Sequence, residues 1–254
     1  MAGRGDSIPT SLRLVAVIEE VARAGVPITP TEANARLGLP KPTIHRLFAT
    51  LEAEGFVERD MGGRAYGPGP RLRALSAGVL SSLRVRTART AILRRVSEEV
   101  GETCNIALPD GDAMIYLERV ETEWPLRIQL PIGTRVPLHC TASGKTYLAS
   151  LSPAHLRAFL GGAPLEARTP ATITDPDALA AELRAVREEG RALDRGEFMD
   201  GMVAIAVPVA DAQGRLLATL SIHAPGSRMD VERAIGHLGV LRGAARDLAA
   251  LASA

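Results

Sequence analysis

Residues 29–64 contain, in a fixed order, the local signals of two short helices and a hairpin, and this order limits the fold more than any other stretch. Residues 29–32 read Thr-Pro-Thr-Glu, a capping box with proline in the first helical position, so a helix is predicted to begin there. It is predicted to end at Gly38, because glycine readily adopts the left-handed conformation found at helix ends. A second amphipathic helix is predicted to end at Gly55. Its apolar stripe consists of Ile44, Leu47, Phe48 and Leu51.

An upstream helix and a downstream ribbon complete this region. An amphipathic helix is predicted from Pro9 to Ala24. Its core residues are expected to be Leu14, Ile18, Val21 and Ala22. Residues 56–59 and 64–66 are predicted to pair as two strands joined at Gly62-Gly63. The sequence therefore predicts a winged helix-turn-helix that places a helix in the major groove of DNA, in preference to a small helical bundle with a solvated polar face.

The second predicted helix carries a polar face opposite its apolar stripe. Side chains of this kind read base edges or bind phosphates. They are Lys41, Thr43, His45, Arg46 and Thr50. On the ribbon, Arg59 and Arg64 are expected near phosphates or an adjacent minor groove.

Length and charge limit the rest of the molecule. The chain has 254 residues, enough for two domains, and a formal net charge of +1. That balance excludes a protein that coats nucleic acid indiscriminately, so any DNA affinity must be local. Every charged residue in 61–97 is an arginine, which predicts either a basic belt or a solvated helix surface in a chain whose lysines are Lys41 and Lys145 alone.

Cysteine usage and hydropathy indicate the compartment. Cys104 and Cys140 are too few for a disulfide framework, and the N-terminus lacks the layout of a signal peptide. The apolar run Met202–Ala210 is too short to cross a bilayer. A cytoplasmic protein without a membrane role is expected.

Residues 71–87 are predicted to form a linker helix. Its apolar positions follow helical spacing. They are Leu72, Leu75, Val79 and Leu83. Such a stripe has little of its own domain to bury against, so contact with a second copy is favoured over packing within the chain. The predicted domains are 8–70 for DNA binding, 71–87 for the linker, and 88–254 for effector binding and oligomerisation.

The order of elements after residue 88 predicts an α+β domain with an antiparallel sheet. Strands are predicted at Asn105–Leu108, Ala113–Leu117, Leu126–Leu130, Met202–Ala210 and Leu216–Ala224. Helices are predicted at Thr141–Leu151, from Ser152-Pro153, from Asp175-Pro176 to Glu189, and at Val231–Leu251.

Several kinds of chemistry are disfavoured by residue spacing. Gly144-Lys145-Thr146 ends like a phosphate-binding loop, but the required glycine five positions earlier is His139. Ser143 lacks the flanking glycines of a nucleophile elbow. Cys140 beside His139 is read as a core residue rather than a reactive thiol. The histidines show no metal-ligand spacing, so no catalytic residue, metal or cofactor is predicted.

Residues 141–144 (Thr-Ala-Ser-Gly) allow two interpretations. If a strand turns directly into a helix here, the first turn presents unpaired amides and the positive end of the helix dipole to an anion. The same small residues also permit close packing of a helix on a sheet. The residues by themselves do not favour one interpretation over the other.

From about Ile8 to the last helix, the chain resembles the IclR family of bacterial transcriptional regulators. The resemblance in the first half lies in residues 37–41, 43–47 and 51–57, which follow the family's recognition-helix pattern. In the second half it lies in residues 137–145 and 197–206. It implies a winged helix-turn-helix head, a helical linker and a GAF-like (profilin-like) effector domain. It also implies homodimers, often paired into tetramers, that bind inverted repeats in duplex DNA.

The same resemblance implies an effector site for a small carboxylate. The backbone at Ala142 and Ser143 would hold the carboxylate. The side chains lining the remainder would be Asp194, Ala204, Ser221 and His223. Ala204 offers no polar atom and His223 offers a titratable ring, which argues against glyoxylate-like specificity.

One departure from the family pattern is Pro42, where serine is common. Proline disfavours helical geometry at the preceding residue, so the recognition helix is predicted to begin one residue late, with Lys41 as a phosphate contact at its start.

The expected protein is a non-enzymatic repressor of a catabolic operon that senses a small organic acid. The alternatives are a constitutive DNA-binding protein whose C-terminal domain only oligomerises, and an enzyme that depends on Cys140.

Overall fold

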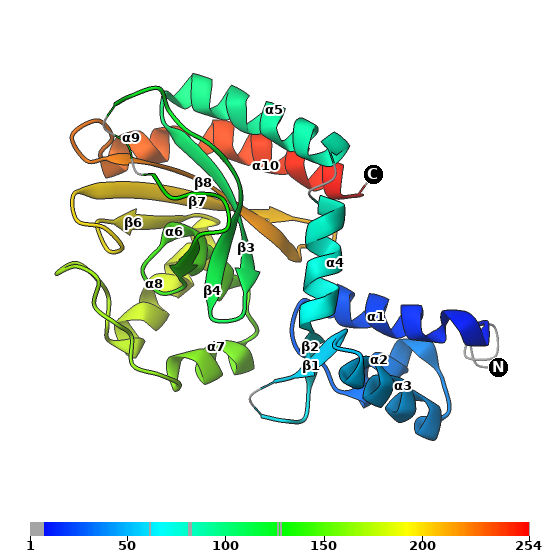
Figure 1. Cartoon of the computed structure of the whole chain (residues 1–254). Coiled ribbons are helices and arrows are strands. Elements are labelled where there is room, and N and C mark those ends of the chain that lie inside the picture. The colour runs from blue at the N-terminus through cyan, green and yellow to red at the C-terminus, as the bar shows by residue number, and fades with distance from the viewer. Residues whose placement is uncertain (1–7, 61, 81–82, 126, 128, 254) are drawn as a thin grey trace. The chain divides into compact units, whose positions relative to one another are not determined.

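The computed structural model describes residues 8–60, 62–80, 83–125, 127 and 129–253. The chain divides into two compact units, Met1–Leu83 and Arg84–Ala254, called here the head unit and the sheet unit (Figure 1). Within the described residues, no helix combines the length and apolar character that crossing a membrane requires.

The head unit is a winged helix-turn-helix followed by one further helix. Its elements are a 3₁₀ turn at Thr10–Leu12, α1 (Arg13–Ala24), α2 (Pro30–Leu37), α3 (Lys41–Ala53), β1 (Val57–Arg59), β2 (Tyr66–Pro68) and α4 (Pro70–Leu80). The prediction that the recognition helix starts late was wrong, because α3 already includes Lys41, with Pro42 in its first turn. The upstream helix begins at Arg13 rather than Pro9, after the 3₁₀ turn.

Local hydrogen bonds fix the start of α2 and the turn between α2 and α3. The Thr29 side chain accepts from the Glu32 amide at 3.2 Å, and the Glu32 carboxylate accepts from the Thr29 amide at 2.7 Å. Gly38 ends α2 with φ of 63°. The Asn34 side chain then bonds both the amide and the carbonyl of Leu39, at 2.9 and 2.8 Å. The capping box was predicted; the asparagine clasp was not.

The head core joins the three helices to the ribbon. It consists of Val17, Val21, Ala33, Leu37, Leu39, Ile44, Phe48, Leu51, Val57 and Tyr66. The rings of Phe48 and Tyr66 lie 4.9 Å apart, so the ribbon packs directly on the recognition helix. Ala22, expected in this core, is exposed, and Val17 is buried instead.

The sheet unit contains a six-stranded antiparallel sheet in the order β5-β4-β3-β8-β7-β6. The strands are β3 (Thr103–Asp110), β4 (Ala113–Val120), β5 (Arg135–Pro137), β6 (Ala192–Arg195), β7 (Met202–Ala210) and β8 (Leu216–Pro225). The helices are α5 (Leu83–Val100), α6 (Ala142–Ser150), α7 (Pro153–Leu160), α8 (Pro176–Glu189), α9 (Val231–Gly236) and α10 (Leu238–Ser253). The predicted antiparallel α+β class is confirmed.

Five elements differ from expectation. Of the predicted strand Leu126–Leu130, residues 126 and 128 lie outside the described part, and the other three are not in a strand. The edge strands β5 and β6 are too short to give a period-two signal. Helix α5 runs to Val100, well into a stretch whose pattern indicated mixed structure. The single C-terminal helix is interrupted at His237.

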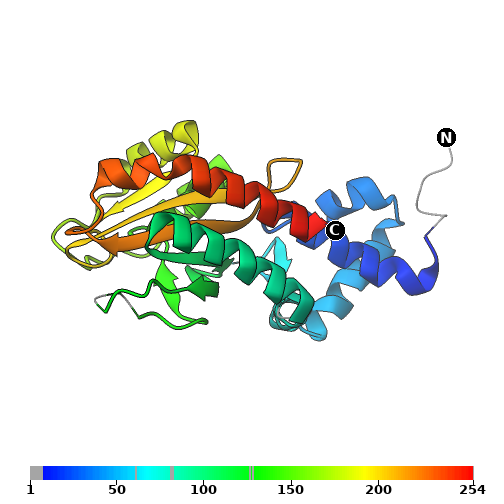
Figure 2. The same cartoon turned by 90° about the horizontal axis from the view of Figure 1, so that it is seen from above.

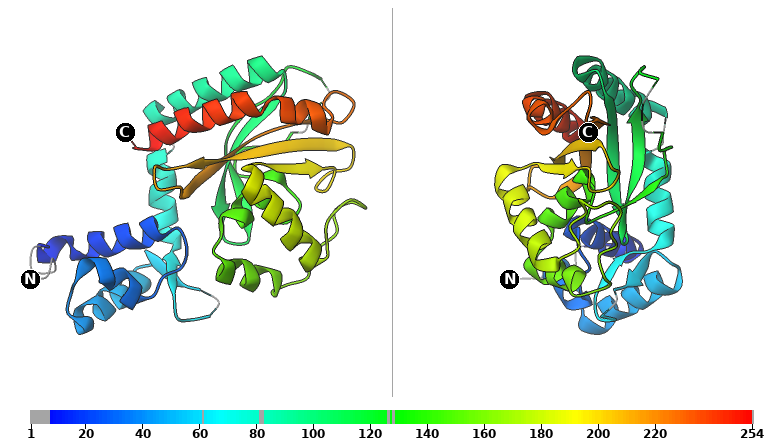
Figure 3. Two further views of the ribbon diagram at one scale, coloured as in Figure 1. Left: turned by 180° about the vertical axis from the view of Figure 1, so that it is seen from behind. Right: turned by 90° about the vertical axis from the view of Figure 1, so that its left-hand side faces the viewer.

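The two faces of the sheet differ in character (Figures 2 and 3). One face packs against α5, α9 and α10 and is largely apolar, except for Glu118 on β4, which pairs with Arg86 and Arg89 of α5. Its strand residues include Cys104, Ile106, Leu193, Ile205, Val207, Leu220 and Ile222. The opposite face, covered by α6, α7 and α8, has an apolar cluster around Met114, Leu148 and Leu183, but also carries buried polar residues. The predicted effector residues lie on this second face.

Candidate functional site

The exposed face of α3 carries the expected polar side chains. Lys41, His45, Arg46 and Thr50 are exposed, and Thr43 is half-buried. Within the described residues, no side-chain hydrogen bond or ion pair is recorded for Lys41, His45 or Arg46, while the Thr50 hydroxyl donates to the Arg46 carbonyl at 3.0 Å. Because Ile44 and Phe48 anchor the opposite face, the helix presents these groups outward.

The two wing arginines have different environments. Arg64 is exposed, with no side-chain partner recorded among the described residues. Arg59 donates to the Glu52 carboxylate on α3 at 2.8 Å and lies 4.8 Å from the centre of the Tyr66 ring. Its hydrogen bond holds the pKa of the Glu52 carboxyl below its ordinary value. Arg59 therefore connects the wing to the recognition helix. Its side chain is also about half exposed.

Acidic residues compensate much of the arginine-rich stretch 61–97. Arg71 pairs with Glu54 at 2.9 Å and Arg73 with Glu58 at 2.6 Å. In the sheet unit, Arg86 and Arg89 approach Glu118, and Arg95 pairs with Asp247. The basic-belt interpretation is therefore wrong for most of these side chains.

Strand register assembles the second site. His223 lies opposite Ala204, and Ala204 lies opposite Asp194, so these three share one face of the sheet. Ser221, two residues before His223, shares that face, and Asn105 lies opposite Ser221. The Ser143 hydroxyl, in the first turn of α6, donates to the Ser221 hydroxyl at 3.3 Å. All six predicted effector residues therefore border one cavity.

The cavity lies at the N-terminus of α6. Thr141 caps the helix by accepting from the Gly144 amide at 3.0 Å, and its hydroxyl donates to the Pro137 carbonyl at 2.7 Å. The Ala142 and Ser143 amides are the first two of the helix and have no intrahelical acceptor. Gly144 is required here, because a Cβ would lie 2.2 Å from the Leu138 carbonyl oxygen. The site combines two free amides with the positive end of the helix dipole.

A loop after β6 closes the cavity. The Asp194 carboxylate accepts from the amides of Glu197 and Phe198, at 2.7 and 3.3 Å, and so fixes the start of this loop. The enclosed volume is about 30 Å³, room for a water molecule. A larger ligand must displace the loop side chains Phe198, Met199 or Met202 that line it.

Two titratable side chains in the cavity have shifted pKa values. Burial raises the pKa of Asp194 to about 7, with the nearby charge of Glu197 adding to the effect and the loop amides opposing it. Burial, together with the Arg119 charge, lowers the pKa of His223 to about 3. His223 is therefore neutral at physiological pH and acts by hydrogen bonding; the expected titratable ring does not change charge there.

A buried lysine links α6 to the loop. Lys145 is fully buried, with Nζ 2.6 Å from Glu197 Oε1 and 3.2 Å from Glu182 Oε1. It therefore joins the helix that offers the amides to the loop that closes the cavity. No phosphate-binding role is open to this lysine, since its ammonium group faces two carboxylates.

Other lining residues were not predicted. They are Tyr116, Leu130, Phe198, Met199 and Met202, whereas Thr141 belongs to the 141–144 segment interpreted above. Behind His223 lie Asn105, which is fully buried, and Arg119, whose side chain is 3% exposed. A sequence signal did exist for Asn105 and Arg119, because each is a polar residue at an inward position of a strand. Asn105, for example, lies between Cys104 and Ile106.

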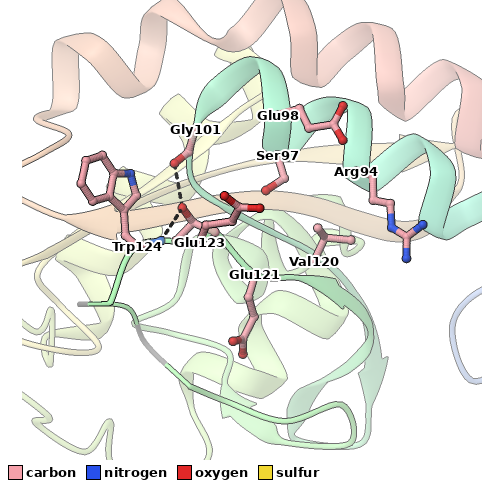
Figure 4. A pocket seen from close by; sticks show the side chains of 9 residues that line it. Arg94, Ser97, Glu98, Gly101, Val120, Glu121, Glu123 and Trp124 are labelled. Atoms are coloured by element: carbon pink, nitrogen blue, oxygen red, sulfur yellow. Dashed lines mark hydrogen bonds between the residues drawn. The ribbon is translucent and has the colours of Figure 1, made fainter.

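A wider hollow of about 690 Å³ lies along α5 and residues 120–124 (Figure 4). The Thr122 hydroxyl donates to the Gly101 carbonyl at 3.0 Å and accepts from the Trp124 amide at 3.5 Å. The lining includes three glutamates against one arginine, and none of the predicted effector residues. Its charge disfavours an anion, so the small cavity at α6 is the better candidate despite its size.

The thiol of Cys140 is not activated. Cys140 is fully buried, and burial, together with the charges of Asp194 and Glu197, raises its pKa to about 12. Its neighbour His139 bonds the Glu166 carbonyl at 2.9 Å. A nucleophilic thiolate requires the opposite shift.

A winged helix-turn-helix joined to a separate domain with a polar cavity is the arrangement of a DNA-binding transcriptional regulator. Residues 12–61 match the IclR helix-turn-helix domain, and residues 77–250 match the C-terminal domain of the bacterial transcriptional regulator IclR. The chain belongs to the IclR family of bacterial transcriptional regulators.

Individual relatives agree with this assignment. The HTH-type transcriptional regulator BhcR of Paracoccus denitrificans is 38% identical, over 87% of this chain and 79% of its own length. The crystal structure of Thermotoga maritima IclR matches with a TM-score of 0.63 and 27% identity, over 95% of this chain and 97% of that one. An IclR homologue from Microbacterium hydrocarbonoxydans, solved with 4-hydroxybenzoate, matches with a TM-score of 0.62 and 26% identity, over 95% and 100%. These relatives are regulators, and the protein is a DNA-binding regulator rather than an enzyme.

Proposed function

We propose that this regulator is a repressor of a catabolic operon and leaves its operator when a small carboxylate binds at the N-terminus of α6. The observation that carries the proposal is the shared cavity. It is bordered by Ala142, Ser143, Asp194, Ala204, Ser221 and His223. Two amides without intrahelical acceptors and a helix dipole favour an anionic group. The ligand of one solved homologue, 4-hydroxybenzoate, also has a carboxylate group.

Asp194 makes anion binding dependent on protonation. With a pKa near 7, its carboxyl group can enter the complex protonated and donate to the effector, whereas the ionised form repels it. His223 stays neutral and Lys145 is committed to Glu197 and Glu182. Of these three side chains, Asp194 is therefore the one whose protonation state can change when a charged ligand binds.

On the head unit, Thr43, His45, Arg46 and Thr50 are proposed to contact bases, and Lys41, Arg59 and Arg64 to contact phosphates. The operator is proposed to be an inverted repeat bound by a dimer or a pair of dimers. Leu75 and Val79 on α4, which are 60% and 63% exposed, support contact with a second copy. Mass measurement in solution tests this part, and a strict monomer contradicts it.

The effector site is tested by removing one amide while keeping the helix. Ala142 is the first helical residue and Thr141 before it is extended (φ −110°, ψ 147°), so proline fits the backbone at 142 but supplies no N–H. We expect short carboxylic acids of two to four carbons to release operator DNA from the native protein, followed by fluorescence anisotropy. The Ala142→Pro variant is expected to stay bound.

The matched control is Ala142→Ser, which keeps the amide and is expected to respond as the native protein does. Equal release from the proline variant contradicts the assignment of the amides. DNA affinity that no acid changes in the native protein favours the constitutive alternative, in which the sheet unit serves only assembly.

A further inference from the structure

Three side chains behind the cavity form a chain of hydrogen bonds across β4, β3 and β8. Arg119 Nη1 donates to Asn105 Oδ1 at 3.1 Å. Asn105 Nδ2 lies 2.9 Å from His223 Nδ1. All three are buried, and register brings them together, with Asn105 opposite Arg119 on one side and Ser221 on the other.

This series of hydrogen bonds determines which ring nitrogen of His223 carries the proton. The guanidinium of Arg119 can only donate, so the oxygen of the Asn105 amide must face it. The amide nitrogen therefore faces His223 and donates to Nδ1. Rotating the amide by 180° would set its nitrogen, a donor, against the Arg119 guanidinium, also a donor, at 3.1 Å. A neutral ring that accepts at Nδ1 carries its hydrogen at Nε2.

Among the residues that the structure describes, no acceptor is recorded for the resulting Nε2–H. Its recorded polar neighbour among the described residues is Arg119 Nη2 at 3.5 Å, itself a donor. His223 is 7% exposed and lines the cavity. A buried N–H of this kind is costly unless a ligand or a water molecule accepts from it, and the adjacent guanidinium, which also pairs with Glu121 at 3.1 Å, favours an anionic acceptor.

The His223 end of the cavity is separate from the α6 end. Ser143 meets Ser221 at 3.3 Å, and His223 lies two residues further along β8, about 7 Å at the rise of a strand. Tyr116 also lines the cavity, and no hydrogen bond of its hydroxyl is recorded among the described residues. Once the loop side chains Phe198, Met199 or Met202 are displaced, a short ligand can reach from the amides to His223 with one group at each end.

We propose that Arg119 and Asn105 hold His223 as the Nε2–H tautomer, and that this end of the cavity recognises a second anionic group on a short carboxylate effector. The inference rests on the proposed function, because it takes the first carboxylate to bind at α6. The effector class becomes a dianion of two to four carbons. Arg119 and Asn105 are positioning residues that act through His223.

The tautomer is tested without any ligand. Nitrogen-15 NMR of the histidine rings in the full chain at pH 7 is expected to show a neutral ring protonated at Nε2, assigned by its loss in His223→Gln. Protonation at Nδ1, or a charged ring at pH 7, overturns the proposal.

The second anionic group is tested by comparing malonate with propionate, which has a methyl group in place of the second carboxylate. Calorimetry on the native protein is expected to give malonate at least a roughly tenfold lower Kd. In Arg119→Met that ratio is expected to fall below about threefold, while the Kd of propionate stays nearly constant. Asn105→Leu is expected to lower the ratio too, and serves if the arginine variant does not fold.

Arg127→Met is the matched control, since Arg127 pairs with Glu121 as Arg119 does, at 2.8 and 3.1 Å, but no contact with Asn105 or His223 is recorded for it among the described residues. It is expected to keep the native ratio. Equal Kd values for the two acids in the native protein contradict this inference alone. Binding of neither acid contradicts the proposed effector class and this inference together.

Discussion

The head unit and the sheet unit use charge in opposite ways. In the head, the pairs of Arg71 with Glu54 and of Arg73 with Glu58 lie on the surface, each about half exposed. In the sheet unit, Lys145 is fully buried against Glu197, whose side chain is 3% exposed. Surface pairs remain solvated and contribute little, whereas a buried charge is held in one arrangement by its partner.

The comparison also applies to packing. The head joins short elements that follow each other along the chain, while the cavity needs α6 seated against the turn before it and strands from distant parts of the sequence. A substitution where α6 packs against that turn should therefore destabilise the sheet unit more than a local substitution destabilises the head.

The largest effect is expected for Gly144→Ala. The new Cβ would lie 2.2 Å from the Leu138 oxygen and 2.4 Å from Leu138 Cα, both backbone atoms that cannot move aside. We expect a loss of about 3 kcal/mol or more in the free energy of unfolding. Chemical denaturation measures it. Gly239→Ala, at an exposed position of α10 with open space around it, should be neutral or stabilising by up to about 1 kcal/mol. An unchanged denaturation midpoint for Gly144→Ala would show that the contact between α6 and Leu138 is not rigid.

Removing the buried cation should cost nearly as much. Lys145→Met leaves the Glu197 carboxylate buried without its partner, which typically destabilises by about 3 to 5 kcal/mol. Changing Glu197 to Gln as well removes the uncompensated charge, so the double variant is expected to recover most of the loss. A double variant no more stable than Lys145→Met contradicts this account.

Asp194→Asn should change how stability depends on pH. The folded pKa of Asp194, about 7, lies above its ordinary 3.8, so the folded protein retains a proton that the unfolded chain has lost. Its contribution is complete below about pH 4, falls as pH rises to about 7, and is then constant, a change of at most about 4 kcal/mol.

Asparagine keeps an oxygen for the amides of Glu197 and Phe198 but cannot ionise. The variant should therefore match the native protein near pH 4 and exceed it in stability at pH 8. A difference between the two proteins that does not vary with pH contradicts the raised pKa.

On the head, Arg46→Ala tests base recognition. If Arg46 binds a guanine with two hydrogen bonds, the variant loses about 1 to 3 kcal/mol of operator affinity and no longer discriminates at one base pair. Arg64→Ala, which removes a proposed phosphate contact, should weaken binding to all sequences alike and lower the salt dependence by about one charge. Uniform weakening by Arg46→Ala would reassign that residue to a phosphate.

The smallest effect is expected for Glu58→Gln. It removes the charge partner of Arg73 at 2.6 Å, but both side chains are partly solvated, so we expect 0 to about 1 kcal/mol by thermal unfolding. A loss as large as that of Lys145→Met would erase the difference between the two units.

How far sequence reasoning reached also differs between the units. The capping box at Thr29, the end of α2 at Gly38 and the helix from Asp175 to Gly190 were predicted because each is a signal within a few residues. The short edge strands and the extent of α5 were not, because strands of three or four residues have no period of their own and α5 gains its stability from the sheet.

The sequence by itself determined the winged helix-turn-helix, the antiparallel class and the small residues at the start of α6, since these depend on backbone preferences and periodicity. Tertiary structure decided that Asp194, Ser221 and His223 meet, because strand register joins residues far apart in the chain. It also decided the protonation of His223. That state depends on burial and on the charge of Arg119 from a neighbouring strand, and no local pattern encodes the electrostatic field at a side chain.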